Sequence, residues 1–399
     1  MALINRVLAF VPMVASLVFT TRAVPQTRAS TTPERRFIVL ELKGTPAERG
    51  KKYGEQLREQ IQKSVAIWKQ NVQTTFKMDP DAFINKFVAE TNYIPAIEHW
   101  TPGLLDEVRG ISEGSGIDFN TILAFQLMDE YWVNADAIAI EHCSVLGTAA
   151  TALHPNVIAQ NMDLETFRDG FQTILHITEP SGLQQFVLTQ PGLIAFNGMN
   201  SAGVGVNTNT VAQLAHARQG LPVAFVVRGV LQRSTFPDVE SFLKSVHHAS
   251  GQSYTIGASG RVAYFEASAN KVVELCGKQN GEFIYHTNHP IMNSDYSSEG
   301  ARQMQNPEET DNSHTRYSAL QKRLSENPGS DALETIKATL RSHDSEQHPI
   351  CRAANSRDGL FSYSSTIMVL TGQPRLIASP GPPDQYEYEV FRFGGTKPK

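Results

Sequence analysis

Cys143, Cys276 and Cys351 are the residues of this 399-residue chain whose type most directly suggests covalent chemistry. A thiol has a pKa of about 8.5, so at neutral pH it needs a nearby base to act as a nucleophile. In an exported chain an odd cysteine count leaves at least one thiol outside any disulfide. Cys276 and Cys351 could pair and leave Cys143, but the sequence alone does not decide this. A lone cysteine is also often a buried structural residue, so its surroundings must distinguish the roles.

Cys143 stands where the chain changes from a helical pattern to a strand-rich one, directly before a strand candidate at residues 144–148. Several polar clusters interrupt the otherwise apolar half that follows. They are Gln160-Asn161-Met162-Asp163, Gly198-Met199-Asn200-Ser201-Ala202-Gly203, His286-Thr287-Asn288-His289-Pro290, Pro349-Ile350-Cys351-Arg352 and Ser364-Ser365-Thr366. These clusters contain amides and charged groups that an active-site thiol requires, and they favour a functional role for Cys143.

Two other patterns suggest chemistry but lack the context that it needs. Residues 110–114 fit the nucleophile-elbow pattern G-x-S-x-G, which works only as a strand-to-helix turn. Here the pattern follows a helical stripe, so we predict the end of a helix. His286 and His289 lie three residues apart, and His247 and His248 are adjacent, but no further ligand has zinc spacing. We therefore expect neither a metal nor a cofactor.

The chain before Cys143 is predicted to be mainly helical. Residues 37–42 are a strand candidate, and Thr45-Pro46-Ala47-Glu48 begins a helix with a capping box and a proline in its first turn. Further helices are predicted from Pro102 and from about Asn120 to Tyr131. A buried stripe at helical spacing follows the capping box and consists of Tyr53, Leu57, Ile61, Val65 and Trp68.

The chain after Cys143 is predicted to combine strands and helices. The strand candidates are residues 144–148, 157–162, 173–178, 185–189, 262–266, 272–275, 283–286, 365–370 and 375–379. The helix candidates are residues 222–232, 236–246, 314–324 and 331–340. Paired strands with helices between them predict an α+β fold in which helices cover the outer faces of the sheets.

The first residues have the pattern of a secretory signal peptide. After Arg6, residues 7–19 are almost purely apolar, which is too short for a comfortable membrane span. We expect a signal peptide at 1–23, a flexible leader at 24–36 and a secreted or periplasmic protein without stable membrane insertion; an uncleaved anchor is the alternative. The formal net charge of −5 argues against a nucleic-acid partner.

From about Leu42 to Pro383 the sequence resembles the peptidase C45 family, the acyl-coenzyme A:6-aminopenicillanic acid acyltransferase-like (isopenicillin N acyltransferase-like) Ntn hydrolases. Its marks are Gly44…Glu48-Arg49-Gly50…Gly54, Glu107-Val108-Arg109-Gly110-Ile111-Ser112-Glu113-Gly114, Cys143, the Gln-Asn-x-Asp strand, the Gly-Met-Asn-Ser-Ala-Gly turn, His-Thr-Asn-His and Gly381-Pro382-Pro383. No single motif is decisive, but their order and spacing together are specific.

The resemblance implies an N-terminal-nucleophile (Ntn) hydrolase fold, a four-layer αββα sandwich, made as a precursor that cuts itself before Cys143. Residues 37–399 would form one domain, cleaved into an α fragment (37–142) and a β fragment (143–399) that remain associated. Cys143 would supply both the thiol and a new α-amine as base. By position, Asn288 matches the oxyanion-hole donor, and Asp163 and Arg352 match charged groups around the nucleophile. Without the resemblance, Asp163 would be interpreted as a turn cap and Arg352 as a surface salt bridge.

The resemblance also implies a small-molecule amide substrate. Acyl-coenzyme A is an intracellular metabolite, so an exported member is expected to transfer its acyl group to water or to an extracellular amine. We predict an amidohydrolase that cleaves a non-peptide amide, such as an N-acyl amino acid, a lactam side chain or a lipid amide. One alternative is an acyltransferase that moves an acyl group from a thioester to an amine. The other is an unprocessed, inactive binding protein with the same fold.

Overall fold

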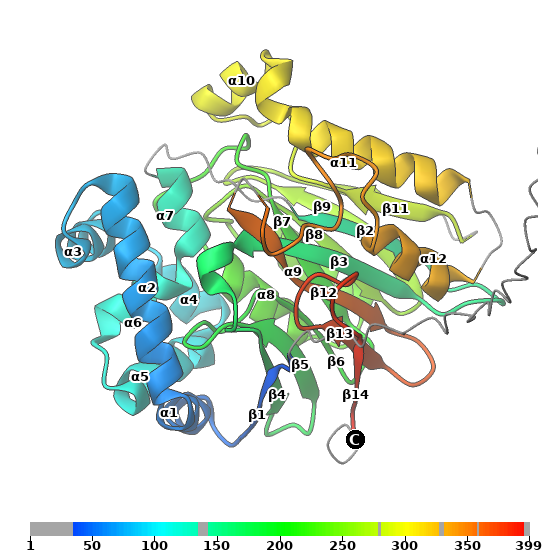
Figure 1. Cartoon of the computed structure of the whole chain (residues 1–399). Helices are drawn as coiled ribbons and strands as arrows, with labels where there is room; N and C mark the ends of the chain where they lie inside the picture. Colours follow the sequence, from blue (N-terminus) through cyan, green and yellow to red (C-terminus); the bar gives the residue numbers. More distant parts are fainter. Residues whose placement is uncertain (1–34, 135–142, 278–280, 327–330, 357–358, 395–399) are drawn as a thin grey trace, which may run out of the picture. The chain divides into compact units, whose positions relative to one another are not determined.

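In a computed structural model, the chain forms two β-sheets, one of eight strands and one of six (Figure 1). The structure describes residues 35–134, 143–277, 281–326, 331–356 and 359–394. The eight-stranded sheet has the order β1-β4-β5-β6-β7-β8-β9-β10, with all neighbours antiparallel except the parallel pair β1 and β4. Its strands are β1 (Ile38–Lys43), β4 (Thr173–Thr178), β5 (Gln184–Thr189), β6 (Asn197–Asn200), β7 (Gly205–Thr210), β8 (Gln252–Ala258), β9 (Arg261–Ala267) and β10 (Val272–Cys276).

The six-stranded sheet is antiparallel throughout and has the order β11-β2-β3-β12-β13-β14. Its strands are β2 (Ser144–Thr148), β3 (Val157–Glu165), β11 (Phe283–His286), β12 (Leu360–Val369), β13 (Arg375–Ser379) and β14 (Glu389–Arg392). The long central pair β3 and β12 has a register irregularity between Ser362 and Ser364. Because β2 and β3 are antiparallel, the residues that begin β2 lie beside those near the end of β3.

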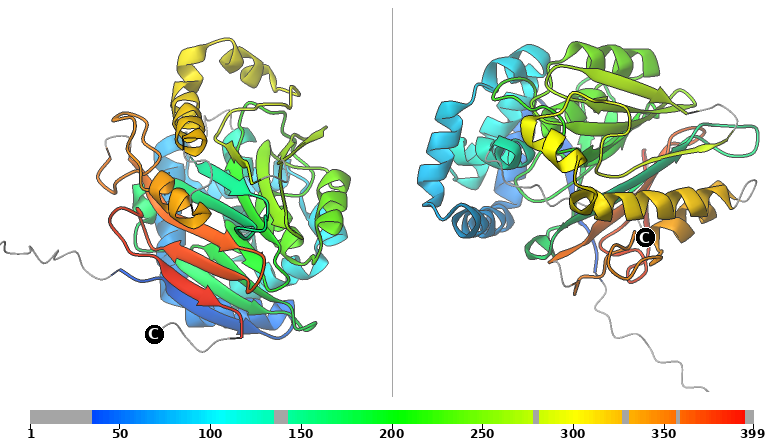
Figure 2. Two further views of the ribbon diagram at one scale, coloured as in Figure 1. Left: turned by 90° about the vertical axis from the view of Figure 1, so that its right-hand side faces the viewer. Right: turned by 90° about the horizontal axis from the view of Figure 1, so that it is seen from above.

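Helices cover the outer face of each sheet (Figure 2). The eight-stranded sheet is covered by α1 (Pro46–Gln56), α2 (Arg58–Phe76), α3 (Pro80–Glu90), α4 (Ile94–Trp100), α5 (Pro102–Ser115), α6 (Phe119–Gln126), α7 (Met128–Asn134), α8 (Val223–Leu231) and α9 (Phe236–Ser245). On the other side lie α10 (Ser298–Met304), α11 (Pro307–Ser325) and α12 (Ala332–Leu340), of which α11 and α12 pack on the six-stranded sheet. None of the helices in the described ranges has the length and apolarity needed to cross a bilayer.

Three apolar layers connect these elements. One lies between the first helices and the eight-stranded sheet, and another joins β3 to Leu320 and Leu324 of α11. The middle layer holds the two sheets face to face and contains Ile158 from one sheet and Leu188 from the other. The order helix, sheet, sheet, helix confirms the predicted α+β fold with four αββα layers.

Most predicted elements are present, with two corrections to the helical half. The stripe from Tyr53 to Trp68 is buried as predicted, but it spans two helices that break at Leu57. The helix expected from Asn120 to Tyr131 is likewise divided at Leu127 into α6 and α7. The pattern missed α3, α4, α10, β6, β7, β8 and β14. Strands β6 to β8 were not predicted, because the faces that they turn to the other sheet carry polar residues instead of the alternating apolar residues typical of a half-buried strand.

The glycine-rich family motifs have a structural explanation in the packing of α1 against α5. A Cβ atom on Gly50 would lie 1.9 Å from the Glu107 carbonyl oxygen, and one on Gly114 would lie 2.2 Å from that of Lys51. The two helices approach so closely that only glycine fits. The G-x-S-x-G pattern therefore belongs to a helix, which ends at Gly116 in the left-handed region (φ 75°), as the sequence predicted.

Candidate active site

Cys143 lies directly before β2 and is almost completely buried, with 2% of its surface exposed. It belongs to the apolar layer between the two sheets. Residues 135–142, including His142 of the predicted cleavage junction, lie outside the described residues. Cys143, Cys276 and Cys351, all in the described part of the chain, are thiols and form no disulfide.

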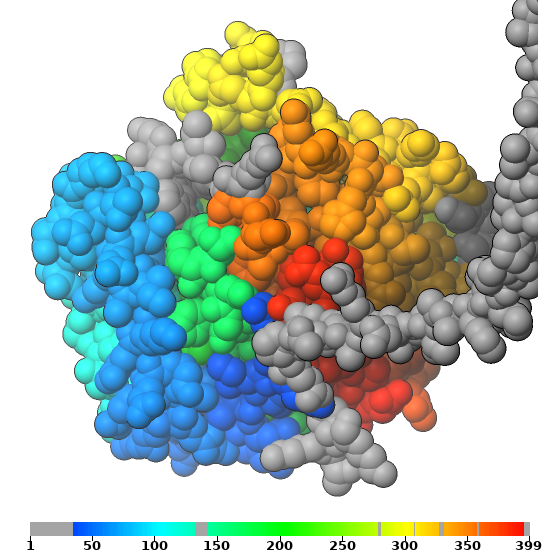
Figure 3. Space-filling model, viewed as in Figure 1, coloured from blue at the N-terminus to red at the C-terminus, as the bar shows by residue number. Residues whose placement is uncertain are grey.

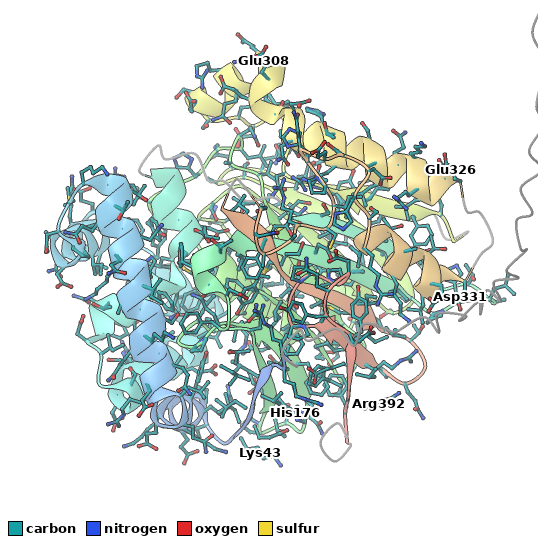
Figure 4. The ribbon with its side chains drawn as sticks, viewed as in Figure 1. Lys43, His176, Glu308, Glu326, Asp331 and Arg392 are labelled. Atoms are coloured by element: carbon teal, nitrogen blue, oxygen red, sulfur yellow. The ribbon has the colours of Figure 1, made fainter. Side chains whose placement is uncertain are left out.

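Arg316 of α11 connects Cys143 to Asn288. Its Nη1 donates to the Cys143 carbonyl oxygen at 2.5 Å and to Ser144 Oγ at 3.0 Å, and its Nη2 donates to Asn288 Oδ1 at 2.9 Å. Its Nε donates to Asn312 Oδ1 at 2.8 Å, one helical turn earlier. Burial lowers the pKa of Arg316 to about 10 despite the opposing effect of Asp163, so the guanidinium is charged at neutral pH. Glu308 and Glu326 mark the two ends of this helix in Figure 4.

The side-chain amide of Asn288 is held at both ends. Its Oδ1 accepts from Arg316, and its Nδ2 donates to the Thr210 carbonyl oxygen at 3.0 Å. The backbone N–H of Asn288 donates to Ser313 Oγ at 2.7 Å. Because an arginine can only donate, these contacts determine which end of the amide is the NH₂ group.

A second amide, Asn209 of β7, also contacts Cys143. Its Nδ2 lies 2.9 Å from the Thr287 carbonyl oxygen and 3.4 Å from that of Cys143. Its Oδ1 accepts from Gln160 Nε2 at 3.2 Å, and Gln160 Oε1 accepts from Asn197 Nδ2 at 2.7 Å. This buried chain of amides crosses between the two sheets and holds the start of β2 against the segment that carries Asn288.

Asp163 and Arg352 form a buried ion pair. Arg352 Nε lies 3.2 Å from Asp163 Oδ2, and the two side chains are 1% and 0% exposed. Ser362 Oγ donates to Asp163 Oδ1 at 2.7 Å and accepts from the Arg352 backbone N–H at 3.0 Å. Both charges also influence the pKa of Arg316, Asp163 raising it and Arg352 lowering it. Arg352 is therefore not a surface cation, and the four residues predicted for the site lie around Arg316.

Glu266 and His286 fix the segment that carries Asn288. Glu266 accepts from His286 Nε2 at 2.8 Å and from the backbone N–H groups of Ile291, Met292 and Asn293 at 2.6–2.9 Å. Burial alone would raise the pKa of Glu266, but the hydrogen bond from His286 and those from the backbone N–H groups of Asn293 and Ile291 hold that pKa below its usual value. Both ring nitrogens of His286 have protein partners, since Nδ1 bonds the Thr287 carbonyl oxygen at 2.6 Å.

The sequence reasoning missed Arg316, Asn209 and Glu266. A signal was present for Arg316, which precedes the buried residues Leu320 and Leu324 at intervals of four. A cation in line with the apolar stripe of a helix is a candidate for a buried functional charge. Asn209 and Glu266 had no comparable local signal, because their partners on the Asn288 segment, Thr287 and His286, lie 78 and 20 residues away in sequence.

The chain matches the family model described as acyl-coenzyme A:6-aminopenicillanic acid acyl-transferase over residues 152–375. The chain belongs to this family. The matched residues begin after Cys143 and include Asp163, Asn288 and Arg352. As a member of the acyl-transferase family with the αββα fold, the protein is an Ntn hydrolase-type enzyme of the amidase or acyltransferase kind.

Individual proteins similar to this chain include the 40 kDa form of acyl-coenzyme A:6-aminopenicillanic-acid-acyltransferase from Emericella nidulans. It is 24% identical over 315 residues, which cover 78% of this chain and 83% of that protein. The Caenorhabditis elegans N-acylethanolamine-hydrolyzing acid amidase ortholog is 13% identical (TM-score 0.40; 57% of this chain, 92% of that chain). Penicillin V acylase from Agrobacterium tumefaciens is 13% identical (TM-score 0.40; 62% of this chain, 86% of that chain).

Proposed function

We propose that this enzyme is a self-processing amidohydrolase whose nucleophile is Cys143, exposed as a new N-terminus by cleavage after His142. The observation that carries the proposal is the position of Arg316. One guanidinium binds both the Cys143 carbonyl oxygen and Asn288 Oδ1, so a side-chain amide donor is held next to the residue that would carry the acyl group.

In the proposed reaction the α-amine of Cys143 takes the thiol proton, and the thiolate attacks the carbonyl carbon of the substrate amide. An α-amine titrates near about 8, which suits this exchange at neutral pH. The C–N bond breaks as the ammonium returns its proton to the leaving amine, and an acyl thioester remains on sulfur. Water, deprotonated by the same amine, then hydrolyses the thioester and restores the thiol.

Asn288 is proposed to stabilise the negative oxygen that develops on the attacked carbonyl carbon. An NH₂ group has two hydrogens, and the bond to the Thr210 carbonyl oxygen uses one of them. The other is the proposed donor to the oxyanion. Arg316 supports this role because a charged group on Oδ1 polarises the amide and prevents it from turning over. Asp163 and Arg352 would hold the start of β2 in place during self-cleavage.

The substrate is proposed to be a small, non-peptide amide, such as an N-acyl amino acid, a lactam side chain or a lipid amide. We also propose export, on the basis of the apolar run at residues 7–19, and export would leave water as the ready acyl acceptor. The second candidate is acyl transfer from a thioester, which the name of the similar Emericella nidulans enzyme favours.

Two measurements test these proposals. Intact mass of the purified protein should show two fragments, the second beginning at Cys143, whereas Cys143→Ala should stay a single chain. An active wild-type protein that is uncut between His142 and Cys143 would contradict the mechanism, and an uncut, inactive one would indicate a binding protein.

A panel of chromogenic amides, assayed with and without an acyl-coenzyme A donor and an amine acceptor, distinguishes hydrolysis from acyl transfer.

A further inference from the structure

Two connecting segments on the outer side of the six-stranded sheet bring together an imidazole, a thiol and a carboxylate. His343 and Cys351 lie in the connection between α12 and β12, and Asp384 lies between β13 and β14. His343 Nε2 is 3.1 Å from Asp384 Oδ2, and Cys351 Sγ is 3.1 Å from Asp384 Oδ1. One donor atom from each side chain lies within 4.8 Å of the other two. Figure 3 shows the orange segment around residue 350 bordering the red C-terminal segment on this face.

Protein contacts hold these segments together without the three side chains. The Cys351 backbone N–H donates to the Ser342 carbonyl oxygen at 3.0 Å, which brings the two ends of the segment between His343 and Cys351 together. Arg341 Nε donates to the Pro383 carbonyl oxygen at 2.9 Å, which ties this segment to that of Asp384. The donor set is therefore preorganised, and a ligand bound there would not bear the full cost of ordering the two segments.

His343 and Cys351 line a cavity of about 560 Å³. Its lining also includes the exposed residue Glu346 and Arg352, the partner of Asp163. Cys351 itself is buried, whereas the side chains of His343 and Asp384 are 48% and 28% exposed. An ion could thus reach the thiol from the cavity and keep a coordination position open to water.

We propose that His343, Cys351 and Asp384 form a zinc site separate from the proposed Cys143 active site. Thiolate, imidazole and carboxylate are the donor types that zinc uses, and three protein ligands with an open fourth position are typical of solvent-accessible zinc. Tetrahedral donors at zinc bond lengths lie about 3.3–3.8 Å apart, so small side-chain shifts produce the required geometry. On binding, the Cys351 S–H bond breaks, an S–Zn bond forms and the proton passes to solvent.

The thiol of Cys351 is poorly suited to the alternative role of a second nucleophile. Its Sγ is buried and lies 3.1 Å from Asp384 Oδ1, to which the thiol donates. A metal ion bound there would displace this proton. No sequence pattern indicated this site, because its ligands come from two connecting segments and have no zinc-like spacing.

The experiment uses the full purified protein after removal of metals by a chelator. Zinc is titrated in competition with a chromophoric chelator, and cobalt(II) is substituted to record the charge-transfer absorption of a thiolate ligand. We expect one zinc per chain, a thiolate–cobalt band and a rise in melting temperature. Loss of a residue that only hydrogen-bonds a metal ligand typically weakens metal binding by about 10-fold or more. His343→Ala and Asp384→Asn, which remove ligands themselves, should each weaken zinc binding by at least about 10-fold. Cys351→Ser should abolish the cobalt band.

The matched control for the thiol is Cys276→Ser, because Cys276 is an exposed cysteine hydrogen-bonded to Glu274 on β10. It should bind zinc like the wild type. Cys143→Ala should also bind zinc, which distinguishes this site from chelation by a new N-terminal cysteine. His343 is half exposed, so its replacement should leave the metal-free melting temperature unchanged. Equal zinc affinity in wild type and His343→Ala, or a cobalt spectrum without a thiolate band, would overturn the proposal whatever the outcome for Cys143.

Discussion

Asn288 shows how a single residue acquires a role from its neighbours. A side-chain amide on a surface turn would rotate and exchange partners with water. Here the guanidinium of Arg316 on Oδ1 and the Thr210 carbonyl oxygen on Nδ2 hold the amide in one orientation. Groups that stabilise a transition state are effective when they are oriented before the reaction begins, because no reorganisation is then needed.

Asn288→Ala is expected to reduce turnover by about 100-fold or more, the usual loss for one oxyanion-hole donor, and to leave folding intact. The assay is the chromogenic amide that the wild type cleaves fastest. Asn270→Ala is the matched control, because Asn270 bonds Asp295 at an exposed position away from Cys143. If Asn288→Ala and the control both turn over substrate as fast as the wild type, Asn288 has only a structural role.

The buried pair of Asp163 and Arg352 allows catalysis to be separated from stability. Asp163→Asn leaves a buried arginine without its counter-charge, so it should destabilise the fold by about 3–5 kcal/mol and accumulate uncut precursor. The double variant with Arg352→Gln removes both charges and should recover melting temperature but not cleavage. Thermal melts and denaturing gels measure the two effects. Complete cleavage in both variants would remove the pair from the processing site.

At the element scale, α7 is anchored by two neighbouring buried carboxyl groups. Asp129 accepts from Thr210 Oγ1 at 2.9 Å and from Gln252 Nε2 at 2.8 Å. Glu130 accepts from the Val223 backbone N–H at 2.9 Å and from Ser250 Oγ at 2.8 Å. Burial raises the pKa of both groups, and the adjacent Asp129 helps to raise that of Glu130 to about 8. The anchoring of this helix therefore depends on pH.

The sign of this dependence follows from the raised pKa of Glu130. The carboxyl group is protonated in the folded protein below about pH 8 and in the unfolded chain only below about pH 4.5, the ordinary pKa of a glutamate. Its stabilising contribution is therefore complete below about pH 4.5 and is lost as pH rises through about 8. Melting temperature should fall across this window, and Glu130→Gln should flatten the fall. A Glu130→Gln profile with the same slope as wild type would contradict the assignment.

At the scale of the whole molecule, the two predicted fragments are joined by contacts that cleavage would not break. Strand β1 belongs to the first fragment and pairs in parallel with β4 of the second. Glu107 of the first fragment binds Arg228 of the second at 2.6 Å and also Arg49 at 2.9 Å, with all three side chains fully buried. The fragments should therefore coelute under native conditions and separate only in denaturant.

Glu107→Gln tests this connection, because it removes the carboxylate paired with buried Arg228 and one of the two carboxylates paired with buried Arg49, the other being that of Glu179. We expect a loss of about 3–5 kcal/mol in stability and easier separation of the fragments in denaturant. Glu113→Gln is the matched control on the same helix, since Glu113 pairs with Lys51 where both side chains are about half exposed or more. The control should melt close to the wild type. Similar melting of Glu107→Gln and Glu113→Gln would show that the buried cluster does not hold the fragments.

The amino-acid sequence by itself determined most of the local elements, whereas the order of the four layers was implied by the family resemblance. Thr45, Pro46 and Glu48 specify the start of α1 through contacts three residues apart, and that capping box is present. The change to strands and turns along the sequence likewise predicted β2, β4, β11 and β13 at their observed bounds. Such features depend on interactions between near neighbours along the chain, so composition and spacing are enough to predict them.

Only the tertiary structure brought the site and the proposed zinc ligands together. Arg316 lies 173 residues from Cys143, and Asp384 lies 33 residues from Cys351. Such proximity arises when strands pair across the sheets and helices pack on them, and no periodicity along the chain encodes it. The buried charge of Arg352 was ambiguous for the same reason. A charged residue looks the same in sequence on a surface or in a core, and only the residues packed around it determine the difference.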